Sequence, residues 1–156
     1  MSNRRSKGYS LIELIVAVAL IGVLAAVAAM QYYGYVAKSQ VSRVVSEAAS
    51  SRVAVEACIA SGEMNIGTEP GHCNPLVVSS TLIDGPTQVG AALPVGTGVS
   101  QVNITHNGAT ITAVFGNGSA AAIAGNKITW VRSGTGSWVC VSTASARYNS
   151  VGCPAE

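Results

Sequence analysis

The segment from Leu14 to Met30 constrains this chain more than any other feature. It reads LIVAVALIGVLAAVAAM, without a polar side chain, and Leu11 and Ile12 extend it backward past a single charge, Glu13. An apolar helix of about 20 residues is long enough to cross a bilayer. Such a run does not suit a compact soluble domain of ordinary composition, so the sequence predicts a membrane-spanning helix near the N-terminus.

The surrounding charges and cysteines orient this segment. Arg4, Arg5 and Lys7 come just before it, so the positive-inside rule places the N-terminus in the cytoplasm and everything after Met30 outside. All the cysteines lie beyond the apolar run, at Cys58, Cys73, Cys140 and Cys153. Cysteines confined to one side of a membrane are typical of an oxidising compartment. Both features predict an extracytoplasmic domain.

Composition excludes several classes of function. Charged residues make up only 10% of the chain, against about 25% in typical domains. Three of the nine basic residues lie in the first seven positions, so no basic face remains for phosphate neutralisation. His72 and His106 are far apart and carboxylates are few, which leaves little material for metal or acid–base chemistry. We therefore expect no catalytic residues, no metal site and no cofactor.

A cleaved secretory signal peptide is the simplest alternative, because small residues end the apolar run. Two features oppose it: Glu13 weakens insertion, and the residues after the run keep a helical period. From Lys38 to Ala60, apolar residues recur on one face at 3.6 residues per turn: Val41, Val44, Val45, Ala48, Val55 and Ile59. The pattern predicts one helix over 9–61, about 80 Å long, with its membrane-spanning part at 9–33.

The stretch KGYSLIELIVAVALIGVLAAVAAMQYY, from Lys7 to Tyr33, closely resembles the N-terminus of type IV prepilins. That family has a short basic leader ending in glycine, then an aromatic residue, a small hydroxyl residue, Leu-Ile-Glu-Leu and an apolar helix. The length of the leader and the Cys140 to Cys153 pair resemble the type IVa subclass, with a major pilin as the nearest type. Beyond the first third of the chain, the resemblance is architectural only.

The resemblance implies specific processing. A membrane peptidase would cut after Gly8, leaving residues 1–8 as the leader, and would methylate the new amine of Tyr9. Glu13 would then be the fifth residue of the mature chain and would pair with the Tyr9 amine of a neighbouring subunit during assembly. The alternative for Glu13 is a carboxylate that snorkels to the membrane surface. A carboxylate in hydrocarbon costs a few kcal/mol, so a partner is expected.

The chain departs from the family pattern at three positions. Tyr9 and Ser10 replace the more usual phenylalanine and threonine, and they keep the ring and the hydroxyl. Met30 stands where many relatives have proline before the Gln-Tyr pair. The expected kink, which proline would cause by removing a backbone hydrogen bond, is therefore absent.

The rest of the chain predicts a small domain. Residues 62–98 are rich in glycine and proline and predict an irregular connecting segment. Residues 99–156 predict two β-hairpins, over 99–115 with an Asn107-Gly108 turn and over 127–141, followed by a C-terminal loop. The fold class is α+β, in which the second half of the long helix packs on an antiparallel sheet of about four strands. Trp130 and Trp138 are expected to cover that sheet.

Four cysteines allow three pairings. Nearest-neighbour pairing, Cys58 with Cys73 and Cys140 with Cys153, closes two short loops. The second loop matches the disulfide-closed C-terminal loop of the pilins, which in that family often carries receptor contacts. Arg147 and Tyr148 are the residues in it best suited to such a contact, and a plain staple for the chain end is the alternative.

Arg52 has one potential charged partner on the helix. Arg52 falls within its apolar stripe, and Glu56 lies one turn later, where it could pair with Arg52. The alternatives for Arg52 are a side chain that snorkels past the sheet edge and a salt bridge to another subunit.

The leading hypothesis is a structural subunit of a type IV pilus, which supports surface adhesion, twitching motility and, as an open question, DNA uptake. Its expected partners are other copies of itself, the prepilin peptidase, the inner-membrane assembly machinery, membrane lipid and a host or surface receptor. It would lie in the bacterial inner membrane before assembly and in the extracellular pilus afterwards. Alternatives are a minor pilin, a type II secretion pseudopilin and a secreted or tethered binding module.

Overall fold

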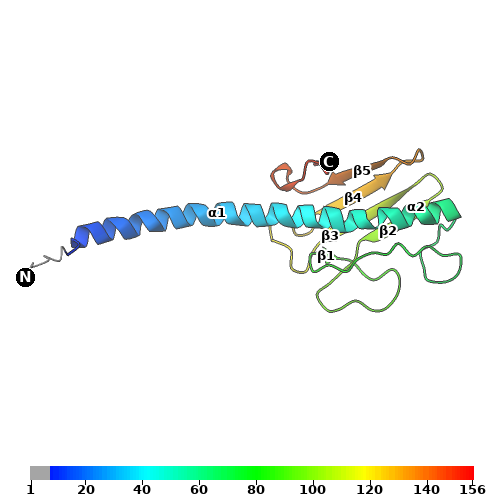
Figure 1. Ribbon diagram of the computed structural model, residues 1–156, viewed down its shortest axis with the longest axis horizontal. Helices are drawn as coiled ribbons and strands as arrows, with labels where there is room; N and C mark the ends of the chain where they lie inside the picture. The colour runs from blue at the N-terminus through cyan, green and yellow to red at the C-terminus, as the bar shows by residue number, and fades with distance from the viewer. Residues whose placement is uncertain (1–7) are drawn as a thin grey trace, which may run out of the picture. The chain divides into compact units, whose positions relative to one another are not determined.

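The computed structural model describes residues 8–156, and the predictions for residues 1–7 lie outside that range. The chain divides after Gly34 into two compact units, which are described separately. Helix α1 (Leu11–Ser50) begins in the first unit (Figure 1). The residues of the first unit on α1 are exposed, or half-buried at Gly34. This apolar part of α1 therefore has no packing partner within residues 8–34.

The second unit contains the remainder of α1, helix α2 (Arg52–Ser61) and the sheet. Ser51 separates the two helices, but its own backbone is helical (φ −73°, ψ −13°), so α2 continues the course of α1. Gly62 ends α2 in a left-handed conformation, φ 78°. Its N–H and that of Glu63 donate to the Ile59 and Cys58 carbonyls, the Schellman arrangement that commonly ends a helix.

A five-stranded antiparallel sheet completes the second unit. The strands are β1 (Ile83–Asp84), β2 (Gln101–Thr105), β3 (Gly108–Phe115), β4 (Lys127–Arg132) and β5 (Trp138–Ser142). β4 pairs with β3 and β5, while β1 and β2 both pair with β3, at its C-terminal and N-terminal ends respectively. The expected α+β class, with helix packed on an antiparallel sheet, is confirmed.

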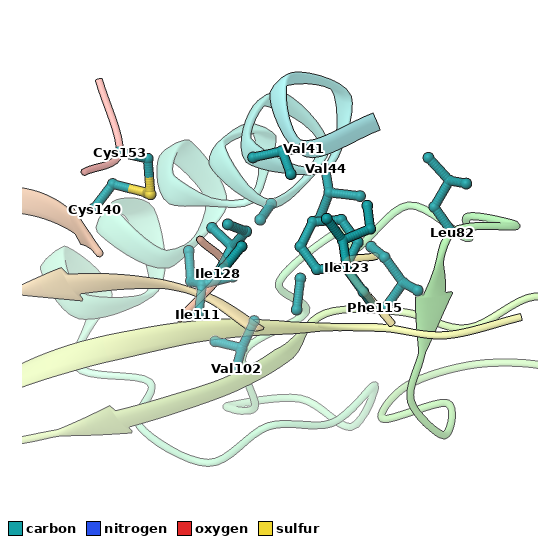
Figure 2. Close-up of a cluster of buried hydrophobic side chains, with 14 of the residues drawn as sticks. Val41, Val44, Leu82, Val102, Ile111, Phe115, Ile123, Ile128, Cys140 and Cys153 are labelled. Carbon is teal, nitrogen blue, oxygen red and sulfur yellow. A yellow bond between two sulfur atoms is a disulfide. The ribbon is translucent and has the colours of Figure 1, made fainter. Parts of the chain in front are cut away.

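The core lies between the helices and one face of the sheet (Figure 2). The helical stripe predicted from sequence is buried, with Val41, Val44, Ala48 and Val55 at 0% exposure. It meets alternate residues of the strands, whose side chains share one face: Val102, Ile111, Ala113, Phe115 and Ile128. Each fully buried Val or Ile contributes about 1.5–3 kcal/mol relative to exposure, so this stripe is the main source of the domain's stability.

Two details differ from the expectations. The segment 62–98, expected to be irregular, contains strand β1, whose two residues are too few to show a strand periodicity. The β2–β3 turn consists of His106 and Asn107, one residue earlier than predicted, because Gly108 already pairs with Thr105. A Cβ at Gly108 would clash with the Arg132 carbonyl, so the glycine is needed for close strand approach and not for the turn. Residues 121–125 form turns between β3 and β4, and Ile123 among them is buried in the core.

Both disulfides follow nearest-neighbour pairing. Cys58 pairs with Cys73 and Cys140 with Cys153, at sequence separations of 15 and 13. Cys140 and Cys153 belong to the core (Figure 2). The backbone N–H of Ser142 donates to the Pro154 carbonyl, and the Glu156 N–H donates to the Ser142 carbonyl, both over 2.9 Å. The bridge therefore holds the chain end against β5.

Replacing Cys140 and Cys153 together with alanine should lower the free energy of unfolding by about 3 kcal/mol, because the unfolded chain regains the freedom that a short closed loop removes. Guanidinium unfolding of the full chain in detergent, followed by tryptophan fluorescence, measures the change. The matched double alanine variant of Cys58 and Cys73 should lose a similar amount. Free thiols at positions 140 and 153 in the native chain would contradict the pairing.

Candidate processing and assembly site

Gly8 and Tyr9 precede the first helix and are fully accessible. The Tyr9 side chain is 83% exposed, and a Cβ built on Gly8 would meet no atom within 4 Å. The packing of this chain therefore does not require glycine at position 8.

Glu13 closes the start of α1. The Ser10 N–H donates to Glu13 Oε2 over 2.8 Å, and the Leu14 N–H donates to the Ser10 carbonyl over 3.3 Å. This is the glutamate half of a capping box, in which a carboxylate three residues into the helix satisfies an N–H that lacks a helical partner. The Ser-x-x-Glu spacing of residues 10–13 is the sequence signal of this capping role, which the apolar run beside Glu13 obscures.

Two shallow apolar grooves lie along this exposed part of α1. One is lined by Leu14, Ile15, Val18 and Ala19, and the other by Ile12, Glu13, Val16, Ala17 and Leu20. Glu13 is the only charged residue in either lining. An apolar helix that packed into the second groove would pass beside this carboxylate, and a cation on that helix would find its partner there.

A cluster of charged and indole groups joins α2 to the sheet. Arg132 of β4 binds Glu56 of α2 with both branches of its guanidinium, Nε to Oε1 at 2.7 Å and Nη2 to Oε2 at 3.0 Å. The Trp138 indole N–H of β5 donates to the same Oε1 over 2.7 Å. Bidentate, charge-assisted bonds of this kind are directional. The Glu56 clasp, formed by Glu56, Arg132 and Trp138, thus sets the position of α2 over the strands.

The predicted pairing of Arg52 with Glu56 is wrong. The Arg52 guanidinium instead lies over the Trp130 ring, 4.1 Å from its centroid, and the Trp130 indole N–H donates to the Val45 carbonyl over 3.2 Å. Glu56 is engaged by Arg132, whose planar fork matches a carboxylate, and Arg52 finds an aromatic face instead. Both tryptophans pack against the core, as expected.

Comparison with known proteins agrees with this geometry. Residues 37–154 match the family model of pilin, the bacterial filament protein, and residues 3–29 match the prokaryotic N-terminal methylation motif. A probable minor fimbrial protein of Dichelobacter nodosus is 40% identical over 152 residues, which cover 96% of each chain. The type IV major fimbrial protein FimA of the same organism is 40% identical over 153 residues, which cover 94% of this chain and 95% of that protein.

The chain belongs to the pilin family. It is a type IV pilin with the N-terminal methylation motif, and pilins are structural proteins without enzymatic activity. Membership implies polymerisation and processing by a prepilin peptidase. Equal identity to a major and a minor fimbrial protein leaves either rank open to this pilin.

The C-terminal loop of the pilin differs from the expectation in one respect. Tyr148, in the short helix η1 (Ala146–Tyr148), is only 6% exposed and belongs to the core, so its ring is not available for a receptor contact. Arg147 remains exposed with its guanidinium 4.4 Å from the centroid of the Tyr148 ring. Val151 projects fully into solvent at 105% exposure. Sequence alone could not show that Tyr148 is buried while Arg147 beside it is exposed, because burial depends on how the loop folds back.

The Glu56 clasp makes the domain's stability depend on pH. The Arg132 hydrogen bond lowers the pKa of Glu56 below its ordinary value of 4.5, partial burial opposes this, and the Trp138 hydrogen bond lowers it further. A pKa that is lower in the folded state stabilises the fold above pH 4.5, and this contribution is lost as the pH falls through the folded-state value.

Glu56→Gln should therefore lower the denaturation midpoint at pH 7 and reduce the difference between midpoints measured at about pH 6 and about pH 3. Guanidinium unfolding at each pH, followed by circular dichroism, measures both effects. Glu69→Gln is the matched control, because Glu69 is exposed in the loop after α2. An equal acid response in Glu56→Gln and the wild type would contradict the role of the clasp.

Proposed function

We propose that this pilin is held in the bacterial inner membrane by residues 9–33, with its N-terminus in the cytoplasm and its disulfide-bonded domain on the far side. Cleavage after Gly8 and methylation of Tyr9 then prepare it for polymerisation into a type IV pilus. The observation that supports this is the exposure of α1: every large apolar side chain from Leu11 to Met30 is more than half exposed. Lipid in the membrane and neighbouring helices in the filament would cover this surface in turn.

The proposed contact between subunits is an ion pair. Cleavage after Gly8 creates a cationic amine on Tyr9, and Glu13 presents a carboxylate beside an apolar groove. In the isolated chain this carboxylate accepts a bond from the Ser10 N–H, which leaves acceptor capacity on both oxygens. A neighbour's amine would fill that capacity away from water, where the attraction between charges is stronger. Pairing therefore favours the filament and fixes the axial register of neighbouring helices.

The proposed roles follow from the filament. A polymer of this pilin extending from the cell would carry surface adhesion and twitching motility, with DNA uptake as a further role of the same filament. Pilins are structural proteins without enzymatic activity, so movement would need inner-membrane assembly proteins as partners. The exposed Arg147 and Val151 of the C-terminal loop are the candidates for a surface or host receptor contact.

Gly8→Val should leave an uncut precursor, because a peptidase that brings its catalytic groups to the backbone has no room for a branched side chain. The fold should be unaffected, since nothing lies within 4 Å of a Cβ at this position. Mass spectrometry of the mature N-terminus gives the result. Gly34→Val, at a glycine with equally open surroundings, should be cut normally before Tyr9, and normal cutting of Gly8→Val would refute the cleavage site.

Glu13→Ala and Glu13→Gln should both be inserted and cleaved but should yield at least about tenfold fewer sheared filaments, the effect of losing about 1.4 kcal/mol per subunit contact. Glutamine keeps an oxygen for the Ser10 N–H and loses only the charge, so it separates pairing from helix capping. Glu13→Lys should be worse, because it places two cations together.

The readout is the filament fraction relative to the cell-bound pool, measured on chains whose N-terminus is Tyr9. Glu69→Gln, which removes a carboxylate from an exposed loop, is the control and should assemble normally. Wild-type yield from Glu13→Gln would assign Glu13 to capping alone. Wild-type yield from Glu13→Lys would exclude the ion pair.

A further inference from the structure

Three tyrosines follow the apolar part of α1 within four positions: Tyr32, Tyr33 and Tyr35. Their side chains are 66%, 71% and 74% exposed. The aromatic residues of the domain behave differently, since Phe115 and Tyr148 are buried and the two tryptophans pack against the core. These three rings therefore serve no purpose in the folding of the domain.

We propose that these tyrosines, here named the tyrosine girdle, lie at the outer lipid headgroup level and set the depth of the pilin in the membrane. The proposal rests on the proposed function, in which the pilin is first held in a bilayer. A phenol ring is apolar in its body and polar at its tip, so it is favoured where hydrocarbon meets water. Within residues 8–156, none of the three hydroxyl groups forms a hydrogen bond, so each is available to headgroups and water.

The length of the helix fits this placement. The 20 residues from Leu11 to Met30 span about 30 Å, the thickness of the hydrocarbon core. The first charged residue after Glu13 is Lys38, eight residues beyond Met30 and so about 12 Å further along α1. No cation stands at the outer end of the apolar run itself. Gln31 and the girdle are the first groups there that prefer the interface to hydrocarbon.

The arrangement of the rings favours lipid over a single protein partner. Successive helical residues are rotated by about 100°, so Tyr32 and Tyr33 start from different sides of the helix, although their rings meet edge to face with centroids 6.2 Å apart. A partner that packs on one stripe needs residues three or four positions apart. Tyr32 and Tyr35 have that spacing, but Tyr33 does not. Adjacent tyrosines cover an arc wider than one stripe, as an interface that surrounds the helix requires.

The girdle also places Glu13. Nineteen residues separate Tyr32 from Glu13, about 28 Å along a helix, so rings at the outer boundary put the carboxylate at the inner boundary. The Ser10 N–H bond holds this carboxylate toward the N-terminal end of α1, which is the side of the inner headgroups. In the membrane pool the Glu13 carboxylate thus lies at the inner edge of the hydrocarbon, where a partner can reach it at a defined level.

Thiol accessibility tests the depth. All four native cysteines are in disulfides, so a single added cysteine is the only free thiol. The full chain would carry one cysteine at a time at five positions: Ala28, Met30, Gln31, Gly34 or Lys38. Spheroplasts of a strain that cannot assemble filaments would then be treated with a membrane-impermeant maleimide. Labelling of the wild-type background should rise from low at Ala28 to high at Gly34.

The decisive variant replaces Tyr32, Tyr33 and Tyr35 with leucine. This lengthens the apolar run, so the rise in labelling should move toward Lys38 by about one helical turn, or 3.6 residues. The matched variant with tryptophan at the same positions keeps interfacial aromatic rings and should leave the rise in place. Disulfide formation, seen as a gel shift on reduction, confirms in each variant that the domain has folded.

The outcomes separate the possibilities. An unchanged labelling profile in the leucine variant, or an equal shift in the tryptophan variant, would overturn the girdle while leaving the membrane-held subunit intact. Equal labelling at all five positions in the wild type would instead show that the segment does not span the membrane, which would overturn the proposed function as well. Loss of filaments without any change in the labelling profile would assign the rings to helix packing in the pilus.

Discussion

Burial of one helical stripe against one face of a sheet is the interaction on which the folded domain depends. Val41, Val44 and Val55 are fully buried, and they belong to the same core cluster as residues of strands β2, β3, β4 and β5. Figure 2 shows Val41 and Val44 in this cluster. An antiparallel sheet with one uncovered apolar face is not stable by itself in water. The helix supplies the missing layer, and the disulfides restrain the two segments that no regular hydrogen-bond ladder holds.

Helix α1 has two different environments along its length. Up to Met30 it is apolar on every side and has no partner within the described residues 8–34, whereas beyond Ala37 it is apolar on one face and polar on the other. The change in pattern marks the change in environment, because lipid surrounds a helix and a sheet covers only one side of it. One secondary structure can therefore join a bilayer or a filament core to a folded domain without a loop.

The helical stripe and the strands β2, β3, β4 and β5 could be predicted from the sequence because each depends on a local periodicity. The pairing of Glu56 with Arg132, which lie 76 residues apart, could not. This pairing depends on the register of β4 against β5 and on the rotation of α2 about its axis, and no local sequence pattern predicts either of them. A local pattern can also mislead, as it does for Arg52 and Glu56. Residues four apart on a helix are near neighbours, but the Trp130 ring on the sheet binds the Arg52 guanidinium instead.

The residues of the candidate site can be named from a sequence motif, whereas their structural context comes from the geometry. Gly8, Tyr9 and Glu13 could be named from sequence, and the structure adds what a motif cannot. The fold of this chain does not require glycine at position 8, which agrees with the proposal that the cleaving peptidase requires it. The hydrogen bond between Ser10 and Glu13 could also have been predicted from the Ser-x-x-Glu spacing. The apolar run beside this carboxylate instead favoured a membrane or assembly role over helix capping.

In the proposed assembly, Glu13 would stabilise both the isolated helix and the polymer, because the two contacts use different acceptor positions of one carboxylate. The Ser10 N–H occupies one acceptor direction on Oε2, and a net hydrogen bond of this kind contributes about 1 kcal/mol whether or not a neighbour is present. That bond cannot drive assembly, since it exists before and after. The negative charge acts differently in the two states. A cation that met it inside an apolar groove would be strongly attracted to it. In the membrane pool, headgroup water and ions largely screen that attraction. In the proposed pairing, only the charge distinguishes the two states. Capping directs the Glu13 carboxylate toward the end of the helix, and a neighbour's amine that reached it there would favour the filament.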